Sequence, residues 1–167
     1  MTKPLIQVVD RDDNLIGHVA RDEFDYATQI YRITALWLTN SQGQVLLAQR
    51  KLTKDKDPGK WGPAAAGTMD EGETYDENIR KETEEEIGVT DIEFVKGPKV
   101  YFESPRMCWA QWYEATLNLS ADEFVIQEDE VEKVEWMDPE WLKNDFEQNP
   151  DKYVPSMKYV IETFINR

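Results

Sequence analysis

The chain has 167 residues, 40% of them hydrophobic, which suits one folded domain with its own core and excludes a disordered chain. Its formal net charge of −15 repels phosphates over long range, so we expect neither a nucleic-acid polymer nor a membrane surface as a partner. Cys108 and His18 are the only cysteine and the only histidine, which excludes an internal disulfide, a thiolate metal cluster and a histidine-rich zinc site.

Strand patterns dominate the N-terminal part of the chain. Apolar runs at Leu5–Val9 and Leu15–Val19, joined by a polar turn, predict a short hairpin. Ile33–Leu38 and Gln44–Gln49 predict a second hairpin, because the segment between them contains the Asn and Gly that tight turns favour. Lys51–Lys60 is polar and contains Pro and Gly, so we expect an exposed loop there.

A helix is predicted from Thr74 to Ile87. This segment lacks Gly and Pro, and its apolar stripe at spacing four consists of Tyr75, Ile79, Thr83 and Ile87. Gly88 then supplies the conformation in which helices commonly end. The predicted helix is therefore about 14 residues long, enough for one face to pack against a core.

Strands and helices alternate in the remaining sequence. Strands are expected at Ile92–Val95, Lys99–Phe102, Met107–Leu117 and Val131–Met137. Helices are expected after Pro139 and after Pro155, where apolar residues follow helical spacing. The sequence contains no internal repeat, and strands interleaved with helices predict one α/β domain spanning residues 1–167.

The predicted central helix carries three glutamates on one face. At about 100° per residue, Glu82, Glu85 and Glu86 fall within one arc that is about 100° wide. Like charges at this spacing repel one another, and the helix dipole disfavours anions in its C-terminal half. A bound cation would compensate both penalties, and oxygen-only ligands suit Mg²⁺ or Mn²⁺. An acidic face exposed to solvent is the alternative interpretation of the glutamates alone.

The spacing of the residues around these glutamates is informative. The pattern is Gly67, five residues, Glu73, seven residues, Lys81-Glu82, two residues, Glu85-Glu86, one residue, Gly88-Val89. It resembles the Nudix box over the full length of that motif. Two departures are visible: Lys81 replaces an arginine, which keeps the charge but loses the planar fork, and Thr83 replaces an aliphatic residue.

The resemblance implies a fold and a metal site. The fold is a Nudix-type α/β/α sandwich with a mixed sheet and a C-terminal helix, in which residues 1–28 form a hairpin extension before a core at 29–167. The implied metal is Mg²⁺, with Mn²⁺ as a substitute, and the implied ligands are Glu82, Glu85, Glu86 and the carbonyl of Ala66. The implied role of Glu73, at the helix start, is to stabilise the loop and the helix N-terminus.

The resemblance also implies an activity, the attack of water on a diphosphate linkage in a nucleoside-diphosphate-linked or similar small substrate. Glu85, Glu86 and Glu130 are the candidates for the general base, although Glu130 is equally consistent with a solvated loop. Arg50, at a strand end, is a candidate for binding a substrate phosphate, and Trp61 for stacking on the substrate. A surface cation and a core tryptophan are the respective alternatives.

A narrower resemblance points to the branch that contains type I isopentenyl-diphosphate isomerase. It rests on the N-terminal hairpin, Asp57–Trp61 and Tyr153–Pro155. Ala66 and Thr68 occupy the region where these isomerases carry a catalytic cysteine and a metal-binding histidine, so hydrolysis is favoured over isomerisation. A divergent isomerase and a non-catalytic diphosphate-binding module stay open as alternatives.

Two further expectations concern the setting of the chain. Met1–Asp10 lacks the basic-then-apolar layout of a signal peptide, and no apolar run reaches membrane-spanning length. We therefore expect a cytoplasmic location. The sequence leaves a homodimer open.

Overall fold

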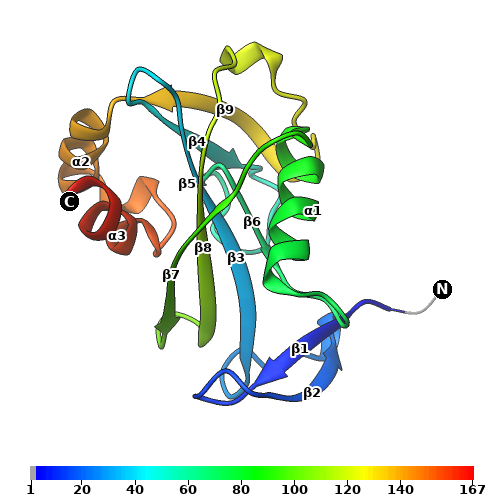
Figure 1. Cartoon of the computed structure of the whole chain (residues 1–167). Coiled ribbons are helices and arrows are strands. Elements are labelled where there is room, and N and C mark those ends of the chain that lie inside the picture. The colour runs from blue at the N-terminus through cyan, green and yellow to red at the C-terminus, as the bar shows by residue number, and fades with distance from the viewer. Residues whose placement is uncertain (1–2) are drawn as a thin grey trace.

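A computed structural model describes residues 3–167; Met1 and Thr2, the first residues of the predicted hairpin extension, lie outside the described residues. Nine strands form one mixed sheet (Figure 1): β1 Leu5–Val9, β2 Leu15–Ala20, β3 Ile30–Thr39, β4 Val45–Arg50, β5 Trp61–Pro63, β6 Ala65–Thr68, β7 Val95–Phe102, β8 Cys108–Thr116 and β9 Val131–Met137. The α-helices are α1 Tyr75–Ile87, α2 Pro139–Gln148 and α3 Met157–Val160, which continues as a π-helical turn at Ile161–Ile165. Short 3₁₀ helices lie at Arg21–Glu23, Ala121–Glu123 and Pro150–Lys152.

Strand β3 is the centre of the sheet. It pairs in parallel with β8 and antiparallel with β1 and β6. Strand β4 pairs with β5 and β9, but it meets β3 only at Thr39 and Val45. The predicted turn between these strands is present, with the Asn40 N–H donating to the Gln44 carbonyl. The second predicted hairpin is thus correct at its turn and wrong along its length, because each strand pairs more extensively with other partners.

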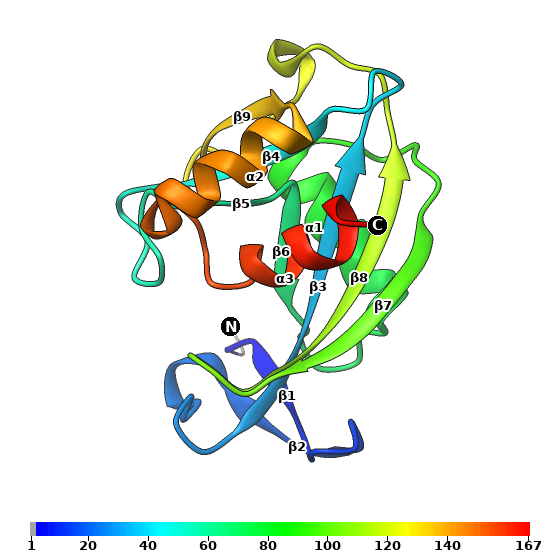
Figure 2. The ribbon, with the colours of Figure 1, turned by 90° about the vertical axis from the view of Figure 1, so that its left-hand side faces the viewer.

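The helices cover both faces of the sheet. Figures 1 and 2 show α1 on one face and α2 with α3 on the other. Alternate residues of β3 point to opposite faces, so Leu36 and Leu38 pack in the core cluster beneath α1. Trp37 lies in the second cluster, with Met157 and Phe164 of the C-terminal segment. This arrangement confirms the predicted α/β/α sandwich, mixed sheet and C-terminal helix.

Helix α1 has the limits that its sequence predicts. Thr74 caps its N-terminus, where the Glu77 N–H donates to the Thr74 hydroxyl and the Thr74 N–H donates to the Glu77 carboxylate. Gly88 ends the helix in the left-handed conformation, with φ of 71°. Because both ends are fixed by local interactions, the sequence predicts this element closely.

The short and interrupted strands differ most from expectation. The predicted strand at Ile92–Val95 is absent apart from Val95, which begins β7; the predicted strand at Lys99–Phe102 is the second half of β7, after an irregularity between Lys96 and Lys99. Strands β5 and β6 are three and four residues long, contain Gly and Pro or small residues, and were not predicted. Their pairing with β4 and β3 determines them, and no local pattern marks such short strands.

The predicted N-terminal hairpin is present as β1 and β2, at the lower end of Figure 1. The Asp13 carboxylate in its turn accepts hydrogen bonds from Arg32 at 2.7 Å, Lys99 at 2.6 Å and Tyr75 at 2.9 Å. The Gln7 amide donates to the carbonyls of Asp70 and Glu73, both at 2.8 Å. The extension is therefore joined to the loop that precedes α1.

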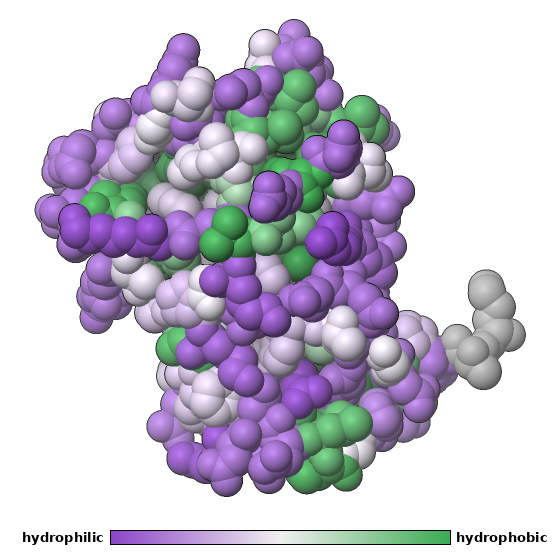
Figure 3. Space-filling view, in the orientation of Figure 1, coloured by the Kyte–Doolittle hydropathy of each residue, from purple (hydrophilic) through white to green (hydrophobic). Residues whose placement is uncertain are grey.

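Hydrophilic side chains cover most of the face seen in Figure 3, as expected of a strongly acidic chain. None of the helices within residues 3–167 combines the length and the apolar character needed to cross a membrane.

Candidate active site

The glutamates of α1 pack against strand β6. The Ala66 N–H donates to a carboxylate oxygen of Glu86 at 3.3 Å. A Cβ added at Gly67 would overlap the carboxyl group of Glu82, so only glycine allows this approach of helix to strand. The N–H and C=O of one residue point to the same edge of a strand, so the Ala66 carbonyl also lies on the side of the glutamates.

Negative charge accumulates in this contact. Burial, followed by the charges of Glu85, Glu73 and Asp70, raises the pKa of Glu82 to about 7, although Lys81 opposes the shift. Burial and the Glu82 carboxylate raise the pKa of Glu86 well above its usual range. Buried, mutually repelling carboxylates are stabilised by a divalent cation, which inverts the local electrostatics.

The donor set fits Mg²⁺ in its chemistry, since it consists of carboxylate and carbonyl oxygens. Glu82, Glu85 and Glu86 all line one groove, and Ala66 borders it as well. Among residues 3–167 no three acidic, histidine or cysteine side chains converge closely enough to form a complete metal-binding group. The predicted ligands therefore line the same groove, but their side chains do not converge around one metal position.

Glu73 and Lys81 hold the loop beside the glutamates. One Glu73 carboxylate oxygen accepts the Asp70 N–H at 2.9 Å and the Asn78 amide at 2.8 Å. The Lys81 ammonium pairs with Glu73, and it lies 3.2 Å from Asp70 and 3.8 Å from Glu82. These contacts agree with the role expected of Glu73, at the loop and the helix N-terminus.

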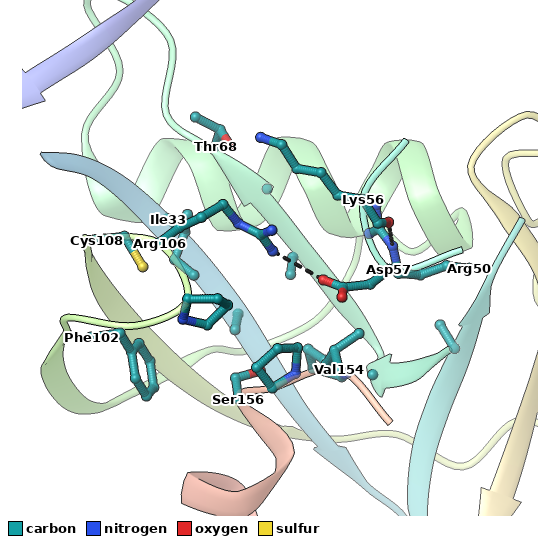
Figure 4. Close-up of a pocket in the computed structure, with 18 of the residues that line it drawn as sticks. Ile33, Arg50, Lys56, Asp57, Thr68, Phe102, Arg106, Cys108, Val154 and Ser156 are labelled. Atoms are coloured by element: carbon teal, nitrogen blue, oxygen red, sulfur yellow. Dashed lines mark hydrogen bonds and ion pairs between the residues drawn. The ribbon is translucent and has the colours of Figure 1, made fainter. Parts of the chain in front are cut away.

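Two cavities meet beside the glutamates. The outer groove has a volume of about 960 Å³, and the inner cavity, which Figure 4 shows, has a volume of about 260 Å³. The residues that border both are Arg50, Lys56, Ala66, Gly67, Thr68, Glu86 and Glu130. We call the place where these residues meet the junction. A ligand at the junction would contact the partly buried Glu86 and extend into either cavity.

Beyond the junction, the inner cavity combines apolar walls with the ion pair between Asp57 and Arg106. Ile33, Phe102, Trp112 and Val154 contribute to its walls. Cys108 also lines it, but burial raises the pKa of this thiol to about 11, which disfavours a nucleophilic thiolate at neutral pH. The cavity is therefore suited to holding an apolar part of a ligand.

The other predicted site residues differ in position. Arg50 and Glu130 both border the junction. The Arg50 Nε donates to the Lys56 carbonyl at 2.9 Å, and Glu130 pairs with Lys54 at 2.6 Å. Trp61 is not among the residues lining either cavity; its ring lies beneath the Lys133 ammonium, 5.4 Å from the ring centroid. The structure thus brings Arg50 and Glu130 to the glutamates but not Trp61.

Lys56, Asp57 and Arg106 line the inner cavity but were not among the predicted site residues. Lys56 and Asp57 belong to the loop expected to be exposed, yet both are only partly exposed. Asp57 has a φ of 49°, a left-handed conformation that Asp tolerates. The Pro and Gly of this segment predict a turn, but they do not predict which way its side chains point.

Sequence comparison identifies the family. A family model described as the NUDIX domain matches residues 30–163. The chain belongs to the Nudix family. A Nudix hydrolase of Yersinia pestis is 28% identical over 162 residues, which is 97% of this chain and 86% of the relative. A prenyl-diphosphate phosphatase of Methanosarcina mazei is 27% identical over 156 residues, 92% of this chain and 91% of the relative.

Solved structures support the fold. The Nudix-family chain is similar to the protein DR0079 of Deinococcus radiodurans, with a TM-score of 0.83 and 20% identity over 95% of this chain and 97% of the other. It is also similar to the NUDIX domain of NrtR from Shewanella oneidensis, whose structure contains ADP-ribose, with a TM-score of 0.65 and 20% identity over 89% and 93% of the two chains. At these identities the likeness concerns the fold alone.

Proposed function

We propose that this Nudix protein is a metal-dependent hydrolase that cleaves a diphosphate linkage in a nucleoside-diphosphate-linked or similar small substrate. The observation that carries the proposal is the junction, where Glu86, Glu130 and Arg50 border two connected cavities beside Glu82 and Glu85. This reaction requires carboxylates that bind a metal, a carboxylate that accepts the proton of water, and a cation that binds a phosphate.

Glu82, Glu85, Glu86 and the Ala66 carbonyl are the residues that would hold Mg²⁺, or Mn²⁺ in its place. When bound, the metal supplies Lewis-acid polarisation of phosphoryl oxygens and lowers the pKa of water. The hydrogen bond between Ala66 and Glu86 at 3.3 Å supports this assignment, because it holds β6 and α1, which carry the proposed metal ligands, next to each other.

The protein groups supply positioning and proton transfer. Arg50 would bind a substrate phosphate, since it borders both cavities and has no carboxylate partner among the ion pairs of residues 3–167. Glu85, Glu86 and Glu130 remain the candidates for accepting the proton of the attacking water. The Lys54 ammonium lies 2.6 Å from the Glu130 carboxylate and holds it at the border of both cavities.

A second candidate substrate is the diphosphate of an apolar alcohol. Two observations favour it: the apolar walls that Ile33, Phe102 and Val154 give the inner cavity, and the likeness to a prenyl-diphosphate phosphatase of Methanosarcina mazei. A compact hydrocarbon is the kind of group that these apolar walls would accommodate. Both candidates share the diphosphate and differ in the group attached to it.

The proposal is tested by measuring phosphate and nucleoside monophosphate release from a panel of nucleoside and prenyl diphosphates with Mg²⁺. We expect turnover of at least one compound, and we expect Glu86→Gln to fold normally and lose activity at least about a hundredfold. Glu84→Gln is the matched control, because Glu84 is an exposed glutamate of α1 that lines neither cavity.

The alternatives give different results. Conversion of isopentenyl diphosphate to dimethylallyl diphosphate would support the divergent isomerase, despite Ala66 and Thr68 in the region of the expected cysteine and histidine. Binding of diphosphates without turnover of any of them would support the non-catalytic module. Full activity of Glu86→Gln would show that the metal assignment is wrong.

A further inference from the structure

Several cations converge on the junction in an otherwise acidic molecule. Lys56 and Arg50 border both cavities, Arg106 lines the inner cavity and Arg21 lines the outer groove. They come from separate segments: the N-terminal extension, the end of β4, the loop after β4 and the loop between β7 and β8. Because the net charge is −15, this concentration of positive charge is a local feature of the fold and not a property of the surface.

The Lys56 ammonium is held by an aromatic ring. Its Nζ lies 3.1 Å from the centroid of the Tyr26 ring, a cation–π contact that leaves the charge without an anionic partner. Within residues 3–167, Lys56 forms no ion pair with a carboxylate, whereas Lys51 and Lys54 of the same loop pair with Glu132 and Glu130.

The charge of Lys56 is disfavoured in the ligand-free protein. Burial, followed by the nearby Arg106, Arg21 and Arg50, lowers the pKa of Lys56 to about 8. Cations that repel one another in a partly buried position are stabilised by a bound anion. The cluster therefore has the electrostatics of an anion-binding site.

Arg106 is oriented by an acid from the same loop as Lys56. Its Nη2 lies 3.0 Å from Oδ2 of Asp57, and Figure 4 shows the guanidinium of Arg106 directed across the cavity towards Asp57. A guanidinium has five N–H donors, so this contact fixes its orientation and leaves donors for a ligand. The charged groups of Lys56 and Arg106 are thus both held in place by neighbouring side chains, and both residues line the inner cavity.

We propose that Lys56 and Arg106 form a phosphate-binding subsite between the α1 glutamates and the apolar inner cavity. This rests on the proposed function, in which the phosphorus under attack lies beside the glutamates. The subsite would bind the phosphate attached to the organic group, and that group would enter the inner cavity. Glu82 and Glu85 line only the outer groove, Lys56 borders both cavities, and Arg106 and Phe102 line only the inner cavity, which supports this direction.

Part of this subsite belongs to the N-terminal extension. The family match begins at residue 30, so Tyr26 and Arg21 lie outside it. The ring of Tyr26 also packs against Phe24 at 4.7 Å and Tyr31 at 5.3 Å between centroids, which fixes its position. The extension therefore contributes to substrate recognition as well as to stability.

The test measures binding of inorganic pyrophosphate to the full-length chain by calorimetry, with chelator present so that no metal contributes. We expect Lys56→Met and Arg106→Met each to weaken binding about tenfold to a hundredfold, the effect of losing a charge-assisted contact. Lys158→Met is the matched control, because Lys158 is exposed on α3 and lines neither cavity. Its affinity should equal that of the wild type.

Variants of Tyr26 distinguish the contribution of its aromatic ring to pyrophosphate binding from that of the Lys56 charge. Tyr26→Leu removes the ring that holds the ammonium and should weaken pyrophosphate binding several-fold, whereas Tyr26→Phe keeps the ring face and should retain it. Circular dichroism and thermal unfolding confirm that each variant is folded.

The outcomes distinguish this proposal from the hydrolase proposal. Weaker pyrophosphate binding by Lys56→Met supports the subsite even if no compound of the substrate panel is turned over. Wild-type affinity in Lys56→Met, or no pyrophosphate binding by the wild type, overturns the subsite even if hydrolysis is observed. With an active substrate, Lys56→Met should raise KM more than it lowers kcat.

Discussion

Lys81 stands where the Nudix box has arginine, and its contacts explain how the substitution is accommodated. Its ammonium is shared by Glu73, Asp70 and Glu82. Although burial lowers it, hydrogen bonds to Glu73 and Asp70 raise the pKa of Lys81 above its ordinary value. Lys81 therefore stays charged at neutral pH and keeps a cation among three carboxylates, without the fork that arginine provides.

A prediction follows for Lys81 as a positioning residue. Lys81→Met should lower kcat about tenfold or more at saturating Mg²⁺, because Glu73 and Glu82 lose the cation that orients them. Lys81→Arg should retain or exceed wild-type activity, which a purely steric role would not explain. Steady-state kinetics of the two variants check this. Equal kcat values for Lys81→Met and the wild type would contradict it.

The other departure from the box, Thr83, has a simple structural basis. Thr83 is fully buried, and its hydroxyl donates to the Ile79 carbonyl at 2.7 Å. The buried hydroxyl is therefore satisfied within its own helix. This position packs in the core beneath α1 and has no direct part in the proposed chemistry.

At the scale of elements, the site depends on how α1 approaches β6. The capping box and Gly88 fix the ends of the helix, and Gly67 lets the Glu82 carboxyl reach the strand. The N-terminal hairpin adds a third element, since Asp13 in its turn contacts Arg32 of β3, Tyr75 of α1 and Lys99 of β7. One carboxylate thus joins the extension to three core elements.

Asp13 provides a stability prediction with a defined pH dependence. Burial raises its pKa, but hydrogen bonds from Lys99, Arg32 and Tyr75 outweigh it and lower the pKa below the ordinary 3.8. A carboxyl group with a lowered folded-state pKa stabilises the fold above its unfolded pKa, and this contribution is lost as the pH falls through the folded value. The Asp13 contribution should therefore be complete at neutral pH and decrease below pH 3.8.

We expect Asp13→Asn to lower the free energy of unfolding by about 3 kcal/mol at pH 7, because a partly buried ion network loses its only anion. Asn tolerates the left-handed backbone at this position, where φ is 63°. Urea unfolding at pH 7 and at acidic pH measures the difference, which should shrink on acidification. Asp12→Asn, an exposed neighbour, should change little. A constant difference at all pH values would disprove the assignment.

At the scale of the whole molecule, the distribution of charge is uneven. The net charge of −15 disfavours an anionic substrate at long range. Glutamates line the outer groove, and Lys56 and Arg50 face the junction. We therefore expect a diphosphate to be attracted only where these cations and a bound metal would be close, which would restrict binding to the interior of the site.

Metal binding should be visible as global stabilisation. At a Mg²⁺ concentration a hundredfold above Kd, binding to the folded state contributes about 2.7 kcal/mol, which corresponds to a rise in Tm of about 5–10 °C for a domain of this size. Differential scanning calorimetry checks this, with NaCl at equal ionic strength as the control for simple screening of the acidic surface. Glu86→Gln should abolish the Mg²⁺-specific rise. An equal rise with NaCl would argue against a metal site.

The sequence by itself determined the features that depend on local interactions. Helix α1 was predictable because its cap, apolar stripe and terminal glycine are all contained in one segment. The fixed spacing from Gly67 to Gly88 predicted the family, which the family model confirms, and it is the basis for proposing Glu82, Glu85 and Glu86 as metal ligands. Arg50 and Glu130 were also proposed as site residues, from a strand end and from an acidic turn.

Only the tertiary structure decided which distant residues meet. Lys56 and Arg106 are 50 residues apart and come together because the sheet places the loop between β4 and β5 beside the loop between β7 and β8, where Asp57 contacts Arg106. Trp61, a plausible stacking residue by type, lies outside both cavities for the same reason. The positions of the α1 glutamates follow from residue spacing along one helix. The position of the proposed Lys56–Arg106 subsite follows from long-range strand pairing, which no local pattern encodes.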